Sequence, residues 1–259
     1  MIKKIIVITS GKGGVGKTTT AINLGAAINH FGKSVLIVDG NLTTPNIGIH
    51  LNSPETPITL NHILSKKAEV FEAVYEHKSG IKVIPSSLSI NELGKIKTER
   101  ITEFKEDFKK LSDYILFDSA AGLGDEAISL MKFADELLIV TNPEMPAITD
   151  ALKTIKVAEK MKKSVKGIIV TRVKKNKIEM NPETVRGMLE APILGMIPED
   201  LNVQKSLSLK DAVVHTHPKS NAARAYKEIA AKILNINYDS DKEKEKMLEK
   251  LMRKLGLKA

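Results

Sequence analysis

The sequence predicts an α/β protein built on one doubly wound, mostly parallel sheet flanked by helices. Short apolar runs of strand length alternate with helix-length segments along most of the 259 residues. A glycine-rich stretch joins the first apolar run to the first helix, and two later apolar runs end in an aspartate. In a parallel sheet the carboxyl ends of the strands meet at one edge, so these features are expected to lie together.

The glycine-rich stretch lies between a strand expected at residues 5–8 and a helix expected at 18–28. It fits the pattern G-x-x-x-x-G-K-[ST] of a phosphate-binding loop (P-loop), in the strand–loop–helix context that the pattern needs. Its residues are Gly11, Lys12, Gly13, Gly14, Val15, Gly16, Lys17, Thr18 and Thr19. Backbone N–H groups cradle phosphate, Lys17 supplies charge, and the Thr18 hydroxyl can hold Mg²⁺. An ordinary glycine turn is the alternative, and it leaves both lysines unexplained.

Two aspartates at strand ends are candidate partners of this loop. The strand expected at 33–39 ends in Asp39, which could bind Mg²⁺ through water or cap the next segment. The strand expected at 114–118 ends in Asp118, the usual water-mediated Mg²⁺ ligand of a phosphate loop. Residues 40–57 and 119–124 follow these strands as loops that could sense the γ-phosphate.

The remaining elements continue the alternation. Short helices are expected at 59–64 and 70–75, strands at 81–85, 136–141, 165–171 and 193–197, and longer helices at 99–111, 146–161, 182–189 and 218–234. We therefore predict one domain over residues 1–234, a linker at 235–241 and a separate C-terminal segment at 242–259.

Composition narrows the class of protein. The chain contains no cysteine, which excludes disulfides, thiolate zinc sites and iron–sulfur clusters and fits a reducing, cytoplasmic setting. No signal peptide is visible, and no apolar run approaches the roughly 20 residues that span a bilayer. The net charge of +9 suits a polyanionic partner, although a lysine-rich thermophilic proteome would also explain it.

The C-terminal segment is predicted to be a basic amphipathic helix. Five aliphatic side chains fall on one face at helical spacing: Met247, Leu248, Leu251, Met252 and Leu255. Lysine and arginine dominate the other face, as in helices that lie in the interface of an anionic membrane. One copy would bind weakly, and two copies on a dimer would gain from effective concentration. The alternative is a helix packed on its own domain or on a neighbour.

Residues 12–19 resemble the deviant Walker A motif of the MinD/ParA ATPases, whose mark is a second lysine near the start of the loop, here Lys12. Further segments match that family in order: 38–39, 118–122, 141–144 and 197–200. The resemblance covers nearly the whole chain and is closest to archaeal MinD-like ATPases. It implies a P-loop NTPase fold, ATP and Mg²⁺ as cofactors, and a homodimer that holds two nucleotides between its subunits.

The resemblance also implies roles for individual residues. Lys12 would reach the phosphates of the partner subunit, as an arginine finger does in trans. Glu144 would face the partner or its nucleotide. Base recognition would use Thr171, Arg172, Pro198, Glu199 and Asp200, although the family often has Asn where Thr171 stands.

One departure from the family concerns hydrolysis. MinD proteins commonly read Asp-x-Asp after the second strand, and the second Asp helps to position the attacking water. This chain has Asp39 and Asn41, and an amide accepts protons poorly. With Lys12, Asp39 and Asn41 as its catalytic residues, the protein is expected to hydrolyse ATP slowly and to form a long-lived ATP-bound dimer.

The leading expectation is a membrane-associated ATPase that positions division or polar machinery, peripheral on the inner face of the cell membrane, with an unidentified protein partner. The alternatives are a partition-type ATPase that binds DNA and a nucleotide-locked scaffold that scarcely hydrolyses ATP. His215 and His217 are expected in a loop rather than in a metal site, because no cysteine or acidic pair is near them in sequence.

Overall fold

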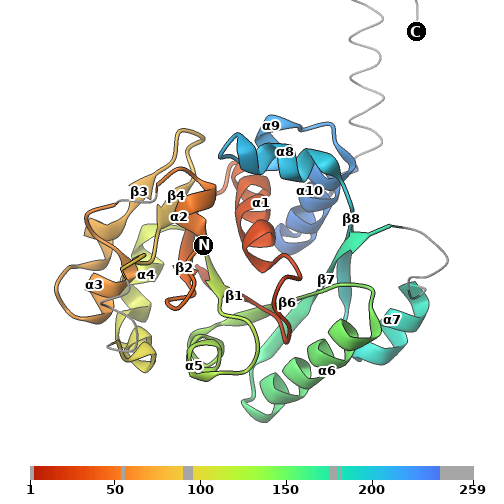
Figure 1. Ribbon diagram of the computed structural model, residues 1–259, viewed down its shortest axis with the longest axis horizontal. Coiled ribbons are helices and arrows are strands. Elements are labelled where there is room, and N and C mark those ends of the chain that lie inside the picture. Colours follow the sequence, from red (N-terminus) through yellow and green to blue (C-terminus); the bar gives the residue numbers. More distant parts are fainter. Residues whose placement is uncertain (1–2, 54–55, 90–95, 175–179, 181, 240–259) are drawn as a thin grey trace, which may run out of the picture.

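An eight-stranded sheet runs through the computed structural model, which describes residues 3–53, 56–89, 96–174, 180 and 182–239 (Figure 1). The strand order is β3-β4-β2-β5-β1-β6-β7-β8, and every neighbouring pair is parallel except β3 and β4. The strands are β1 Lys4–Thr9, β2 Val35–Gly40, β3 Tyr75–Glu76, β4 Lys82–Ile84, β5 Tyr114–Ser119, β6 Glu136–Thr141, β7 Ser164–Val173 and β8 Ile193–Pro198. The predicted fold class is confirmed.

Helices cover both faces of the sheet. The α-helices are α1 Lys17–His30, α2 Ile47–His50, α3 Leu60–Leu64, α4 Lys105–Leu111, α5 Asp125–Phe133, α6 Met145–Lys160, α7 Pro182–Leu189, α8 Leu201–Ser208, α9 Val213–Thr216 and α10 Asn221–Leu234. Two 3₁₀ helices are η1 Val70–Ala73 and η3 Thr98–Phe104. Helices α1 and α8–α10 lie on one side, and α5–α7 lie on the other (Figure 1).

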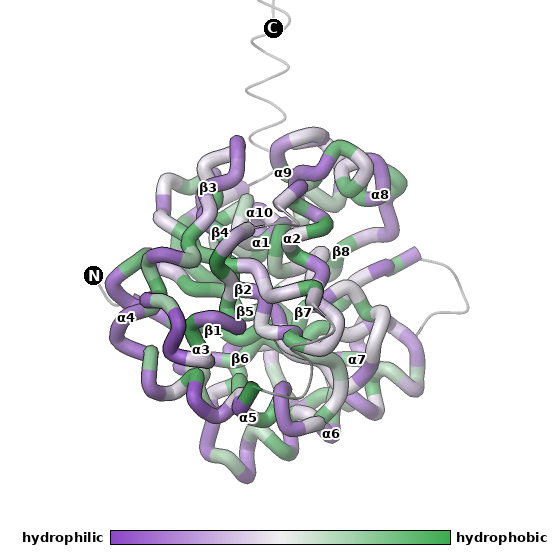
Figure 2. The backbone as a smooth tube through the Cα atoms, turned by 60° about the vertical axis from the view of Figure 1, so that its left-hand side comes forward, coloured by the Kyte–Doolittle hydropathy of each residue, from purple (hydrophilic) through white to green (hydrophobic). Residues whose placement is uncertain are grey.

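The core forms where the strands are apolar on both faces, as is usual when helices cover both faces of a parallel sheet. The four residues from Ile5 to Ile8 in β1 are fully buried, and hydrophobic residues gather along the central strands (Figure 2). Helix α1 is buried along most of its length between the sheet and α10. Gly25 permits this close packing, because a Cβ there would lie 2.6 Å from Cδ1 of Ile37.

The register of the central strands places the predicted site. Asp39 at the end of β2 pairs with Asp118 at the end of β5, and Asp118 pairs with Ile8 of β1. The P-loop leaves β1 directly after this level. Both strand-end carboxylates therefore lie beside the P-loop, as the sequence predicted.

Several predicted elements differ from the structure. The loop expected at 40–57 contains the short helix α2, and the helix expected at 70–75 is the 3₁₀ helix η1 followed by β3. The helix expected at 99–111 is divided into η3 and α4. Helices α5, α8 and α9 were missed, because short helices carry too few residues to show a clear apolar period.

The chain after α10 is described as far as Asp239. The ring of Tyr238 packs edge-on against Phe31 at the end of α1, with centroids 5.2 Å apart, so the segment predicted as a linker contacts the domain. The predicted amphipathic helix at 242–259 lies outside the described residues. Among the described helices, none is long and apolar enough to cross a membrane.

Candidate nucleotide-binding site

The P-loop adopts a conformation that depends on glycine. Gly14 and Gly16 have positive φ angles of 77° and 94°, and α1 begins directly after Gly16. A Cβ on Gly11 would overlap the backbone of Asp150, so the loop rests directly on α6. A loop that packs this tightly presents its N–H groups and the start of α1 as a preformed anion site.

Other strand ends anchor the loop from outside. The Thr171 hydroxyl at the end of β7 donates to the carbonyl of Val15 at 2.6 Å and lies 2.9 Å from Oδ1 of Asn142. The backbone N–H of Gly122 donates to the carbonyl of Ser10 at 2.9 Å. The predicted second switch loop, residues 119–124, is therefore bonded directly to the P-loop.

The two lysines of the loop have opposite environments. Lys17 is only 8% exposed, and burial lowers the pKa of its ammonium, with the Asp118 charge opposing this shift. No described residue hydrogen-bonds its side chain, as expected of a cation placed to receive phosphate. Lys12 is exposed, and within the described chain its ammonium has no hydrogen-bond or ion-pair partner.

The residues predicted to hold Mg²⁺ converge and fit a divalent cation. The Thr18 hydroxyl donates to Oδ2 of Asp118 at 2.5 Å, whereas Oδ1 of Asp118 is buried and unpartnered among the described residues. Burial and the Asp118 charge raise the pKa of Asp39 to about 8, and burial raises the pKa of Asp118 to about 6. Two adjoining buried carboxyls of this kind favour a bound cation, which would be held by Thr18 and, through water, by the aspartates.

Asp39 also accepts hydrogen bonds at the start of α2, although it lies in β2 and the N-cap residue of α2 is Asn46. Its Oδ2 accepts from the backbone N–H groups of Asn46 and Ile47, each at 2.9 Å. Its Oδ1 accepts from the N–H of Asn41 at 3.2 Å. One carboxylate therefore joins the predicted metal site to the loop after β2, and its role as a metal ligand stays a prediction.

The Asn41 side chain closes a turn within that loop. Its Nδ2 donates to the carbonyl of Thr44 at 2.8 Å, and its Oδ1 accepts from the Thr44 N–H at 3.1 Å. Next to it, the Thr43 hydroxyl donates to Oε1 of Glu126 at 3.0 Å, which bonds the loop to the first turn of α5. Asn41 and Glu126 line a cavity of about 660 Å³ between the two predicted switch loops.

A second cavity, of about 290 Å³, is the candidate base pocket. All five residues predicted to recognise the base line it: Thr171, Arg172, Pro198, Glu199 and Asp200. One of their polar groups already has partners in the protein, because the Asp200 carboxylate accepts from the N–H groups of Asn202 at 2.9 Å and Ala222 at 3.2 Å. Asp200 thereby fixes the starts of α8 and α10.

The base pocket also has a wall that the sequence reasoning missed. Helix α8 contributes Val203, Gln204 and Leu207, and α10 contributes the buried Tyr226. The available signal was Asp200 itself, an aspartate directly before a helix-length segment, which is typical of an N-cap. The pocket and the P-loop share Gly16 and Thr19, so one nucleotide can occupy both.

The edge that carries the P-loop also exposes apolar and charged side chains. Glu144 is exposed at the start of α6, beside Met145, which is 54% exposed. Leu123, in the loop after β5, is 37% exposed. Exposed apolar residues beside exposed charged residues on one edge are typical of a surface that meets another subunit.

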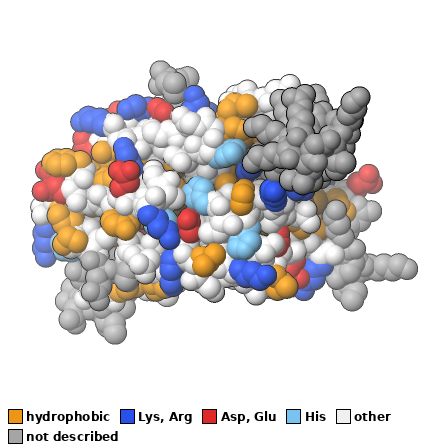
Figure 3. All heavy atoms as spheres, turned by 90° about the horizontal axis from the view of Figure 1, so that it is seen from above, with side chains coloured by type: hydrophobic (Ala, Val, Ile, Leu, Met, Phe, Trp, Pro, Cys, Tyr) orange, Lys and Arg blue, Asp and Glu red, His pale blue; other side chains and the backbone are white. Residues whose placement is uncertain are grey.

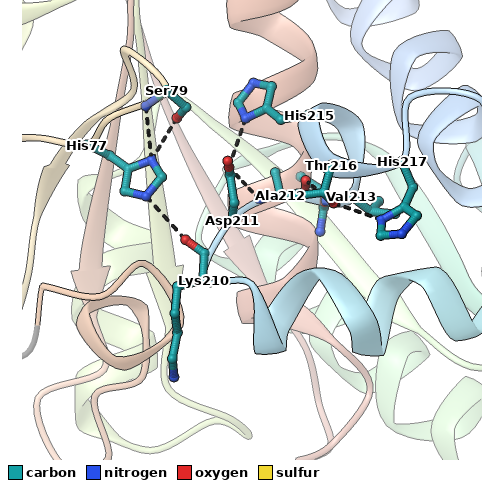
Figure 4. Close-up of polar contacts among 10 residues, drawn as sticks. His77, Ser79, Lys210, Asp211, Ala212, Val213, His215, Thr216 and His217 are labelled. Carbon is teal, nitrogen blue, oxygen red and sulfur yellow. Dashed lines mark hydrogen bonds and ion pairs between the residues drawn. The ribbon is translucent and has the colours of Figure 1, made fainter.

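Of the two histidines expected in a loop, His215 instead lies within α9, and His217 directly follows that helix. The ring of His215 contacts Oδ1 of Asp211 at 2.9 Å through Nδ1, and His217 contacts the Thr216 hydroxyl (Figure 4). In the part of the chain that the structure describes, no group of three or more His, Cys, Asp or Glu side chains could hold a metal ion.

Comparisons with known proteins extend these observations. Residues 1–234 match the ParA family, described as "NUBPL iron-transfer P-loop NTPase". An uncharacterised ATP-binding protein of Methanocaldococcus jannaschii is 35% identical over 252 residues, which cover 96% of each chain.

Two solved structures have the same fold. The cell division ATPase MinD of Pyrococcus furiosus matches with a TM-score of 0.87 and 33% identity over 90% of this chain and 99% of that one. The septum site-determining protein MinD of Pyrococcus horikoshii, complexed with Mg-ADP, matches with a TM-score of 0.85 and 32% identity over 90% and 96%.

Proposed function

Because the chain belongs to the ParA/MinD family of P-loop NTPases, we propose that it is an ATP-switched positioning ATPase of the MinD type. ATP and Mg²⁺ are the cofactors of such NTPases, and the P-loop, the Thr18–Asp118 pair and the base pocket are the features of this chain that would take them. ATP would drive dimerisation, and the dimer would attach to the membrane.

The observation that carries this proposal is the exposed Lys12, which shares a loop with the buried Lys17 and has no hydrogen-bond or ion-pair partner among the described residues. A cation of the phosphate loop that no described residue of its own subunit bonds suits a site completed by a second subunit. The exposed Leu123 and Met145 on the same edge supply apolar surface for that contact. Lys12 would stabilise charge on the partner's nucleotide, and Glu144 would face the partner.

Membrane attachment is proposed from the sequence of residues 242–259 and the net charge of +9. The protein would be cytoplasmic and peripheral on the inner face of the membrane, with a protein partner of unidentified kind. Several lysines near the strand starts already have partners: Lys4 and Lys166 pair with Glu136, and Lys105 and Lys109 pair with Asp135. These ion pairs reduce the positive charge that DNA could contact at the strand-start edge of the sheet. They therefore favour a lipid contact through the tail over a DNA contact through that edge.

Slow hydrolysis is proposed from Asn41. Its amide is held by Thr44 and lacks a proton-accepting carboxylate, so an ATP-bound dimer would persist. The iron-transfer part of the family description is not proposed for this chain, because it contains no cysteine to ligate iron.

The test measures ATPase rate, dimerisation and sedimentation with anionic vesicles for the wild type, Lys12→Ala and a variant lacking 242–259. We expect ATP-dependent dimers that sediment with vesicles. Lys12→Ala is expected to lose turnover, and the truncated variant to lose vesicle binding while it still dimerises. Salt-dependent binding to DNA without lipid binding would instead identify a partition-type ATPase. Dimers without measurable turnover, including with vesicles, would identify a nucleotide-locked scaffold.

A further inference from the structure

Helix α2 is held at both ends by side chains from distant parts of the chain. It has four residues, Ile47–His50, too few for a helix to be stable in isolation. Asp39 accepts the N–H groups at its first turn, and the ammonium of Lys210 donates to the carbonyl of Ile49 in its last turn at 3.1 Å. The conformation of α2 therefore depends on both Asp39 and Lys210.

Lys210 ends α8 in a conformation that usually belongs to glycine. Its φ angle is 56°, its N–H donates to the carbonyl of Leu207, and the N–H of Asp211 donates to the carbonyl of Ser206. This is the Schellman pattern, in which glycine is the common residue because it has no Cβ. A lysine here carries backbone strain that glycine would avoid, and its side chain holds the last turn of α2.

The end of α6 provides the matched comparison. Lys162 has a φ angle of 55° and the same two backbone hydrogen bonds, from Lys162 to Glu159 and from Lys163 to Ala158. Unlike Lys210, it is exposed and its side chain makes no hydrogen bond or ion pair with the rest of the described chain.

The other side of α8 lines the base pocket through Val203, Gln204 and Leu207. The turn at Lys210 is also held from outside, because Nε2 of His77 contacts the Lys210 carbonyl at 3.2 Å. In Figure 4 the Lys210 side chain points away from His77. Figure 3 shows histidine, lysine and acidic side chains gathered over the middle of this face of the molecule.

We infer that Lys210 is a positioning residue that couples the base pocket to the loop after β2. A base seated against α8 would fix the helix and the turn that ends it, and the Lys210 ammonium would then hold α2 in place. Through Asp39, α2 fixes the side of the site where the metal and outer phosphates are expected. This inference rests on the proposed nucleotide-binding function and adds a route between its two ends.

The test is hydrogen exchange of the backbone amides of residues 46–53, measured by mass spectrometry with and without ADP, in the absence of divalent metal. ADP without metal would occupy the base pocket and the P-loop while the metal site stays empty. In the wild type we expect ADP to slow exchange of this segment by about threefold or more. Lys210→Gly should abolish the slowing while ADP still binds, and its turn should remain folded because glycine suits it. Lys210→Arg should retain part of the effect, and Lys162→Gly should match the wild type.

The outcomes separate the inference from the proposed function. Equal slowing in Lys210→Gly and the wild type, or ADP binding to the wild type without slowing, would overturn the coupling alone. A wild-type protein that fails to bind ADP in equilibrium titration would overturn both. Thermal unfolding of each variant establishes that a lost effect does not arise from a lost fold.

Discussion

The Thr171 hydroxyl donates a hydrogen bond of 2.6 Å to the carbonyl of Val15, a residue 156 positions earlier in the chain. The end of β7 thereby holds the middle of the P-loop. The shape of the phosphate site is consequently a property of the sheet as well as of the loop, and changes far from the P-loop sequence should alter nucleotide binding.

Replacing Thr171 tests this dependence. Thr171→Val keeps the shape of the side chain but leaves the Val15 carbonyl without its donor, so we expect the free energy of unfolding to fall by about 1–3 kcal/mol. ADP binding should weaken as well. Urea denaturation and ADP titration measure both effects, with Thr171→Ser as the control that keeps the hydroxyl. A valine variant as stable and as tight as the serine variant would contradict the assignment.

The contact between the P-loop and α6 predicts unequal effects of two alanine substitutions. A Cβ on Gly11 would overlap the Asp150 backbone, whereas a Cβ on Gly13 would meet only the Ala121 Cβ at 3.8 Å. We expect Gly11→Ala to lower the free energy of unfolding by about 1–3 kcal/mol, and Gly13→Ala to change it little. Equal losses of stability in the two variants would show that α6 does not confine the loop.

Substitutions of the two lysines of the P-loop should have different effects on ATP binding and hydrolysis. Lys17 is buried at the phosphate site, so Lys17→Ala should abolish ATP binding. Lys12 is exposed, so Lys12→Ala should leave ATP binding by the monomer nearly intact while turnover falls by about 10³-fold or more. Equilibrium ATP binding and single-turnover hydrolysis separate the two outcomes. Normal turnover in Lys12→Ala would exclude a role for Lys12 in trans.

Restoring a carboxylate at Asn41 should raise turnover. An aspartate can still accept from the Thr44 N–H and adds a group that can take a proton, so we expect Asn41→Asp to hydrolyse ATP about tenfold faster or more. Asn41→Ala loses the Thr44 contacts without gaining a base, and its rate should not rise. Steady-state phosphate release distinguishes these variants. An unchanged rate in Asn41→Asp would show that Asn41 does not limit hydrolysis.

The paired carboxyls predict how stability varies with pH in the absence of nucleotide and metal. Burial raises the pKa of Asp39 to about 8 and that of Asp118 to about 6, so the folded protein retains protons that the unfolded chain releases near pH 4. The free energy of unfolding should therefore fall as pH rises from about 4 to about 8. Mg-ADP should reduce this fall, because a cation stabilises the charged carboxylates.

Denaturation at several pH values measures this dependence, and Asp118→Asn is the informative variant. It removes the neighbouring charge, so the loss of stability between pH values of about 5 and about 8 should be smaller than in the wild type. A loss as large as in the wild type would assign the pH dependence to other groups.

The sequence predicted the phosphate side of the site because its signals are local. Loop spacing identifies Gly11 to Thr19, and an aspartate at the end of an apolar run identifies Asp39 and Asp118. Parallel pairing then brings these residues together without further information, since Asp39 and Asp118 occupy the same level of neighbouring strands.

The base side was less predictable because its helices depend on tertiary contacts. The Asp200 carboxylate at the start of α8 also accepts from the N–H of Ala222 in α10 at 3.2 Å, and α9 starts where the Val213 N–H donates to Oδ1 of Asn23 in α1 at 2.7 Å. The sequence of an eight-residue helix such as α8, or of a four-residue helix such as α9, does not reveal partners that lie in other elements. The contacts of Asn41 with Thr44 are local, but they were not predicted because an asparagine three residues before a threonine does not by itself show which groups its amide bonds.

The four residues of α2 are anchored by one group from the metal side and one from the base side of the site. With two independent anchors on so short a segment, α2 is held firmly only when both are in place. A fragment that fills only one side, such as free phosphate with metal or a nucleoside, would secure only one end. An intact nucleotide with its metal would secure both, and in this way the molecule would distinguish its complete ligand from fragments of it.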